Sequence, residues 1–135
     1  SVLHVDLNRH NRAHLLRAAQ EGIAFAFRYG VDIMRESGLR AGVIRAGHAN
    51  LFLSPLFRST LATLCDANIE LYNTDGALGA ARGAALGAGL YRNRNEAFAS
   101  LRRIEEVHPD PAIRQVLEET YQIWKKELQL QLENQ

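Results

Sequence analysis

Only one cysteine and three prolines occur among the 135 residues, and the formal charges nearly cancel to a net charge of +1. The single thiol, Cys65, excludes an internal disulfide framework and fits a reducing compartment, so we expect a cytoplasmic protein. The net charge is too small to attract nucleic acid or an anionic membrane surface without specific contacts, and we expect neither as a partner.

No run of apolar residues is long enough to cross a membrane. The longest stretch of small and apolar residues, 76–91, contains Arg82 and is rich in glycine, unlike a membrane-spanning helix. What the chain does contain is 47% hydrophobic and 23% charged residues, a balance typical of one compact domain rather than of a disordered segment.

Residues 43–50 form the most informative stretch. They open as a short buried strand and run directly into a loop of small residues around Gly47. Ser54 is a preferred N-cap residue and Pro55 fits the first helical position, so we expect a helix after the loop. This order allows a nucleotide to approach the backbone, but it is also typical of an ordinary strand-to-helix connection, and the stretch alone leaves both interpretations open.

Two long helices are predicted near the ends of the chain. Residues 11–37 place apolar side chains at three- and four-residue intervals, and Gly38 is well placed to end the helix. The same helix carries a second row of small residues, which lets another backbone pack close: Ala18, Gly22 and Ala26. Residues 112–133 form the other helix, whose apolar stripe consists of Ile113, Leu117, Tyr121, Trp124 and Leu128.

Shorter elements are predicted between and before these helices. They are strand-like residues 2–5, a helix at 55–65, a strand at 68–72, a short helix at 93–98 and a linker at 107–111. Residues 68–72 alternate polar and apolar side chains, which indicates a strand towards a sheet edge. A further helix starting near Gly76 consists almost entirely of glycine and alanine. Its glycines recur on one face, which predicts a closely packed neighbour, at Gly79, Gly83 and Gly87.

The order of these elements predicts an α/β fold. Two strand–helix units in succession imply parallel strands covered by helices. Two or three strands are few for so many helices, because sheets usually carry more. We therefore expect the chain to be part of a larger protein.

Four segments of the chain carry a resemblance to a known family. They are NRAHLLRAAQEGIAF (residues 11–25), SPLFR (54–58), DGALGAA (75–81) and VHPD (107–110), the last followed by Tyr121. In this order, and over nearly the whole chain, they resemble the FGGY-type carbohydrate kinases, most of all the xylulose kinases. The resemblance implies the C-terminal part of a ribonuclease H-like (actin-like ATPase) domain, with few parallel strands flanked by helices.

The resemblance also implies a function. Residues 1–135 would be the C-terminal, nucleotide-side domain of a longer kinase, and residues 112–133 an amphipathic helix within it. In that family, this domain binds ATP, used with Mg²⁺, and an N-terminal domain of the same protein binds the sugar that receives the γ-phosphate. The catalytic base and the phosphate-binding turns lie before the region that this chain resembles. We therefore assign no catalytic residue and expect the chain alone to be inactive.

The loop after the first strand corresponds to a glycine run that passes under the adenosine in the family. The expected nucleotide-binding residues are Ala46, Gly47, His48, Ala49 and Asn50, together with Gly76 at the start of the next helix. Gly47 is the position that lets the backbone approach the ligand, and Asn50 is a candidate hydrogen-bonding partner for adenine or ribose. His48 stands where a glycine is expected, so its side chain must point away from the nucleotide or replace it.

Other departures from the family pattern support a second interpretation. Residues 51–53 are additional, and Thr63 stands where the family usually has aspartate. A kinase-derived domain that has lost nucleotide binding and serves as a non-catalytic interaction domain would fit them. Unpaired sheet edges and a vacant domain face leave a homodimer open as well.

No metal ligands are assigned in this chain. His10 and His14 are four residues apart, but glutamate does not follow the first histidine and no third ligand is evident. The ligands of Mg²⁺ are therefore not placed here either. Cys65 has no neighbouring group that would activate it and is interpreted as a thiol of the core.

Overall fold

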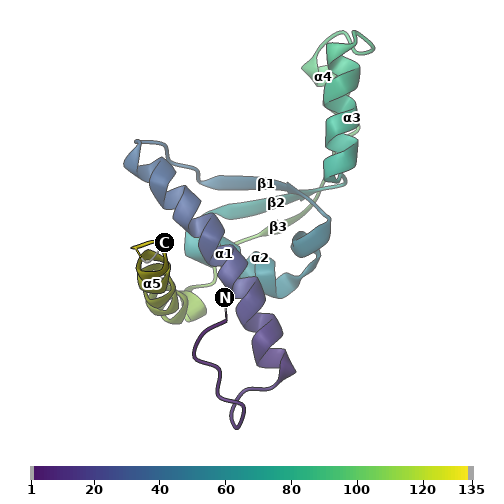
Figure 1. Ribbon diagram of the computed structural model, residues 1–135. Coiled ribbons are helices and arrows are strands. Elements are labelled where there is room, and N and C mark those ends of the chain that lie inside the picture. The colour runs from purple at the N-terminus through teal and green to yellow at the C-terminus, as the bar shows by residue number, and fades with distance from the viewer. Residues whose placement is uncertain (1, 134–135) are drawn as a thin grey trace.

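The computed structural model describes residues 2–133 and contains one small sheet with helices around it (Figure 1). The elements in chain order are α1 (Arg12–Glu36), β1 (Val43–Gly47), the 3₁₀-helix η1 (Asn50–Leu53), α2 (Pro55–Cys65), β2 (Asn68–Tyr72), α3 (Gly76–Gly87), α4 (Arg94–Phe98), β3 (Arg103–Val107) and α5 (Pro111–Glu133). Between residues 2 and 133, no helix is both long and apolar enough to cross a membrane.

The sheet has the strand order β1-β2-β3 and is mixed. β1 and β2 are parallel, as predicted, and pair Val43 with Asn68 through Gly47 with Tyr72. The sequence did not predict β3, which pairs antiparallel with β2 and leaves β2 in the centre of the sheet. The expectation that residues 68–72 lie towards a sheet edge was therefore wrong. The predicted linker at 107–111 is confirmed for residues 108–110, which connect β3 to α5, whereas Val107 ends β3 and Pro111 begins α5.

Residues 2–5 form no strand, contrary to prediction. His4 has a positive φ of 57°, a left-handed conformation that interrupts an extended segment. Its ring lies 3.5 Å from the carboxylate of Glu127 on α5, so this segment runs beside the helices rather than along the sheet.

The predicted helices are confirmed, with boundaries that follow from their capping residues. Asn11 caps α1 by accepting hydrogen bonds from the backbone N–H groups of Ala13 and His14. Gly38, with φ +82°, follows the C-terminal end of that helix. The Ser54 hydroxyl accepts from the N–H of Phe57 and Pro55 takes the first helical position of α2, as expected.

The hydrophobic core lies between α1, α2 and α5 and one face of the sheet (Figure 1). Alternation along β2 directs Ile69 and Leu71 into the core, where both are fully buried. Phe57 of α2 and Tyr121 of α5 are the largest side chains that are almost completely excluded from solvent. The opposite face of β2 carries Glu70, which pairs with arginines on both neighbouring strands and is therefore polar.

A half-buried polar network joins α1, α2 and α5. The carboxylate of Asp32 accepts a hydrogen bond from Nε of Arg28 at 2.7 Å and one from the hydroxyl of Tyr121 at 2.8 Å. Arg28 also donates to the carbonyl oxygen of Leu64, where the C-terminal end of α2 leaves carbonyl groups without helical partners. The network thus links the C-terminal end of α2 to side chains of α1 and α5 and holds the three helices in position relative to one another.

The ionisation of Asp32 should make this network sensitive to acid. Burial alone would raise the pKa of Asp32, but the hydrogen bonds from Arg28 and Tyr121 outweigh it and hold the pKa below its ordinary value. Such a carboxyl stabilises the fold above its unfolded pKa, and the contribution is lost as the pH falls through the folded pKa. We expect Asp32→Asn to be less stable than the parent near neutral pH, with a difference that narrows below about pH 4. Urea unfolding across this range measures both proteins, and parallel stability profiles would contradict the expectation.

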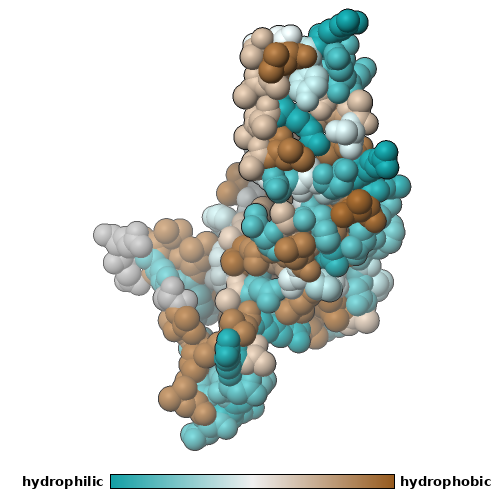
Figure 2. Space-filling view, turned by 90° about the vertical axis from the view of Figure 1, so that its right-hand side faces the viewer, coloured by the Kyte–Doolittle hydropathy of each residue, from teal (hydrophilic) through white to brown (hydrophobic). Residues whose placement is uncertain are grey.

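Helices α3 and α4 form an arm that stands away from the rest of the molecule (Figures 1 and 2). No heavy atom outside the helix's own backbone would lie within 4 Å of a Cβ at Gly79, Gly83 or Gly87. The predicted close neighbour for this glycine face is thus not provided by residues 2–133. Figure 2 shows the arm surface as a mixture of hydrophobic and hydrophilic residues. The side chain of Leu78 on α3 is 45% exposed.

The base of the arm is fastened to the sheet by Asn73. Its backbone N–H donates to the carbonyl of Arg102 at 3.1 Å, and its side-chain oxygen accepts from the N–H of Arg102 at 2.6 Å. Its side-chain nitrogen donates to the carbonyl of Ser100. The chain therefore leaves the sheet at residue 73 and returns to it at residue 102, and these two residues lie side by side.

Candidate functional site

The carboxyl ends of β1 and β2 meet at one edge of the sheet because these strands are parallel. β1 ends at Gly47 and leads through η1 into α2, and β2 ends at Tyr72 and leads into α3. Loops and helix N-termini that follow adjacent parallel strands enclose a crevice, the usual ligand position in open α/β sheets. The residues predicted to bind a nucleotide lie at the end of β1 or in these two connections.

The loop after β1 is held by backbone hydrogen bonds. The N–H of His48 donates to the carbonyl of Tyr72 at 2.9 Å, and the N–H of Ala49 donates to the carbonyl of Gly47 at 2.9 Å. Asn50 then adopts a positive φ of 53°, a conformation that asparagine tolerates better than most residues. The loop is therefore a defined turn rather than an open glycine-rich run.

Gly47 is required by a close contact between the two loops. A Cβ at this position would lie 3.0 Å from the carbonyl carbon of Thr74, closer still to its oxygen, and 3.3 Å from Cα of Asp75. Real Cβ atoms do not approach backbone atoms this closely. Glycine is thus needed here for the contact between the strand ends, independently of any ligand.

A pocket of about 240 Å³ lies in this crevice. Four of the six predicted residues line it, namely Gly47, Ala49, Asn50 and Gly76. The other two do not: Ala46 is half-buried within β1, and His48 is exposed outside the pocket. Gly76 lines the pocket, and a Cβ at this position would meet no heavy atom within 4 Å.

Three aromatic side chains that sequence reasoning did not assign to the site form the apolar wall of the pocket. Phe27 of α1, Phe52 of η1 and Phe57 of α2 all line it. Phe52 and Phe57 pack edge to face with ring centroids 5.4 Å apart. The sequence feature that could have indicated this wall is the additional residues 51–53, because they form most of η1, which brings Phe52 into the wall.

The polar groups of the pocket favour an uncharged ligand portion. Asp75 lines the pocket, and its carboxylate caps α3 by accepting from the N–H of Leu78 at 2.7 Å. This negative charge at the helix N-terminus opposes the binding of a phosphate group beside it. Apart from Asp75 and Asn50, the lining residues are apolar or glycine, which suits an aromatic ring or a ribose.

The histidine pair and the cysteine have structural roles. His14 completes the cap of α1, because its Nδ1 accepts from the backbone N–H of Asn11 at 3.3 Å. His10 accepts in the same way from the N–H of Asp6. Cys65 is buried in the core, as interpreted from the sequence, and burial raises the pKa of its thiol to about 11. Within residues 2–133, no three His, Cys, Asp or Glu side chains cluster as a metal site would require.

The chain matches no protein-family model but resembles known proteins, among them two kinases. It is 34% identical over 118 residues to the L-xylulose/3-keto-L-gulonate kinase of Escherichia coli K12, a match that covers 84% of this chain and 23% of the kinase. It also matches the crystal structure of xylulose kinase from Rhodospirillum rubrum, with a TM-score of 0.70 and 28% identity, over 90% of this chain and 25% of that one. The predicted α/β fold class is confirmed by this match, and the chain spans about a quarter of the length of both proteins.

Proposed function

We propose, from the premise that this chain is related to the FGGY-type carbohydrate kinases and matches a quarter of their length, that it is the ATP-binding part of such a kinase. The complete protein would transfer the γ-phosphate of ATP, in the presence of Mg²⁺, to a hydroxyl of a xylulose-type sugar. An N-terminal domain of the same protein would bind the sugar and supply the catalytic base. The chain alone would then bind nucleotide in the cytoplasm without turning it over.

The observation that carries this proposal is the pocket at the carboxyl ends of β1 and β2. Its volume of about 240 Å³ is below the range of about 300–1,000 Å³ that is typical of complete ligand pockets. A pocket of this size, walled by Phe27, Phe52 and Phe57, suits the adenosine portion of ATP. The triphosphate would extend away from Asp75 towards groups outside this chain.

The predicted site residues would contribute in different ways. Gly76 would lie against the adenosine, because it lines the pocket and carries no side chain that would keep the ligand away. Asn50 would supply a hydrogen bond from the rim of the pocket. His48, which is exposed outside the pocket, would leave the nucleotide position free rather than occupy it. Mg²⁺ would be held by the phosphates and by residues of the complete protein.

Calorimetric titration with ATP·Mg of the chain and of Gly76→Leu tests the site. A leucine at residue 76 enters open space, so it should fill the pocket without disturbing the fold, and we expect affinity to fall at least about tenfold. Gly83→Leu is the matched control, because it adds the same side chain to the same helix, also in open space but outside the pocket. Equal affinities for all three proteins would refute the assignment of the pocket.

A non-catalytic interaction domain is the second candidate. It is favoured by His48 at a glycine position of the family and by the exposed apolar side chains of the chain. The same titration separates the two candidates. A parent chain that is folded by circular dichroism and takes up no ATP·Mg would favour the interaction domain.

A further inference from the structure

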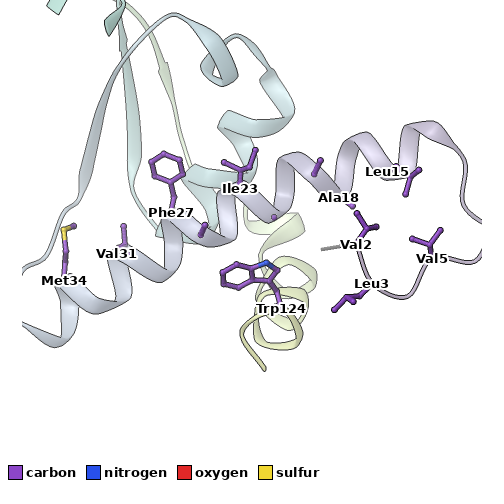
Figure 3. A pocket seen from close by; sticks show the side chains of 14 residues that line it. Val2, Leu3, Val5, Leu15, Ala18, Ile23, Phe27, Val31, Met34 and Trp124 are labelled. Atoms are coloured by element: carbon purple, nitrogen blue, oxygen red, sulfur yellow. The ribbon is translucent and has the colours of Figure 1, made fainter. Parts of the chain in front are cut away.

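Phe27 belongs to two cavities at once. Besides the pocket in the crevice, it lines an apolar groove of about 1130 Å³ along α1, and its ring projects from this helix on the side away from Trp124 (Figure 3). Phe27 is 51% exposed, whereas Phe57 is 1% exposed and Phe52 is half-buried. Of the three rings in the pocket wall, Phe27 therefore has the largest free surface.

The other rings of the wall leave a face of the Phe27 ring open. The ring centroids of Phe27 and Phe57 lie 6.3 Å apart, with an angle of 72° between the ring planes. In such an edge-to-face pair, one ring directs its edge at a face of the other, so the contact covers at most one of the two faces of Phe27. Phe57 makes a second edge-to-face contact with Phe52, at 5.4 Å between centroids. The wall thus offers, on Phe27, a flat aromatic face that its contact with Phe57 does not occupy.

The pocket has few groups that could read a ligand by hydrogen bonds. Among the residues that line it, only Asn50 and Asp75 have polar side chains. One carboxylate oxygen of Asp75 already accepts from the N–H of Leu78. A pocket of this kind discriminates between flat ligands mainly by contact area, and the discrimination is modest. A purine, with two fused rings, has a larger stacking face than a pyrimidine and should bind more tightly for that reason.

We propose that Phe27 is the base-stacking residue of the crevice pocket and that its ring gives the chain a preference for purine over pyrimidine nucleotides. The open face of the ring lies against the base, and Asn50 reaches the edge of the base from the rim. This inference rests on the proposed nucleotide function and adds the residue that selects the base. It also gives α1 a part in binding, in addition to the two connections that follow β1 and β2.

Calorimetric titrations with ATP·Mg and with CTP·Mg compare the parent chain with Phe27→Leu. Leucine keeps an apolar side chain in the wall and removes the flat ring. Stacking on one aromatic side chain contributes enough to base binding that we expect the ATP affinity to fall at least about tenfold in the variant, and the CTP affinity less than about threefold. The parent should prefer ATP to CTP at least about tenfold, and the variant should lose most of this preference.

Two further variants separate stacking from an effect on the fold. Phe27→Tyr keeps the ring and should keep the preference of the parent. Met34→Ala removes another exposed apolar side chain from α1, one that lines the groove but not the crevice pocket, so it should leave both affinities unchanged. Circular dichroism checks that each variant is folded.

The position of the base is read directly by NMR with a chain that is isotopically labelled at phenylalanine. We expect NOE cross-peaks between the base protons of bound ATP and the ring protons of Phe27, and these peaks should be absent in Phe27→Leu. ATP binding with no such peaks, or an ATP-to-CTP preference that Phe27→Leu leaves unchanged, would overturn this inference and leave the proposed function standing. A folded parent chain that binds neither nucleotide would overturn both.

Discussion

Replacing Gly47 with alanine is expected to lower the free energy of unfolding by about 3 kcal/mol, at the upper end of the cost of overpacking. The new methyl group would clash with the backbone of Thr74 and Asp75. Unlike a side chain, this backbone cannot relieve the clash by changing rotamer. Relief requires that the end of β1 separate from the loop before α3. Because both loops line the crevice, the proposed nucleotide affinity should fall with stability.

Urea unfolding of Gly47→Ala against Gly42→Ala measures this effect. Gly42 directly precedes β1, and a Cβ at that position would meet no heavy atom within 4 Å. The control therefore repeats the loss of glycine flexibility without the clash, and it should leave stability within about 1 kcal/mol of the parent. Similar midpoints for the two variants would contradict the close loop contact.

Truncating Tyr121 to alanine is expected to cost about 4 kcal/mol, the largest effect that we predict for a single side chain. The ring is fully buried, lies 5.9 Å from the ring of Phe25 and stacks on Trp124 at 6.1 Å between centroids. Its removal leaves a cavity at the junction of α1 and α5. It also removes the hydroxyl donor to Asp32.

Tyr121→Phe separates these two contributions. The ring remains and only the hydrogen bond to Asp32 is lost, so we expect about 1–2 kcal/mol. Equilibrium unfolding of both variants in urea, with matched m-values, measures the difference. If phenylalanine were as costly as alanine, the polar network rather than packing would dominate this junction.

The sequence allowed most of the helices and the parallel strand pair to be predicted, because capping residues and periodicity acted together. Asn11, Ser54 and Pro55 mark the helix starts by local chemistry that no tertiary contact overrides. β3 was not predicted because three of its five residues, Arg103, Glu105 and Glu106, are charged and give no strand-like alternation. In the structure, Arg103 and Glu106 pair with each other, and Glu105 pairs with Arg58 of α2 at 2.8 Å. Pairing with β2, and not its own pattern, makes it a strand.

The location of the candidate pocket could be predicted from the sequence, but its aromatic wall could not. The order of strand, small-residue loop and helix located the crevice, and four of the six residues named from it line the pocket. Phe27 could not be assigned, since it lies on a helix twenty residues before the loop and reaches the pocket only through tertiary packing. For His48, the sequence left two positions open: a side chain that points away from the nucleotide or one that replaces it. In the structure, the backbone N–H of His48 is hydrogen-bonded to Tyr72 and the side chain is exposed outside the pocket.

The fastening of the arm by Asn73 has a consequence for how this fold can vary. Since residues 73 and 102 are hydrogen-bonded to each other on the sheet, the chain between them is a closed excursion whose length does not affect the register of β2 and β3. The segment that contains α3 and α4 can therefore become longer or shorter, or be replaced, without a change in the packing of the core. The start of this segment is constrained more tightly, because Thr74 contacts Gly47 closely and Asp75 and Gly76 border the crevice.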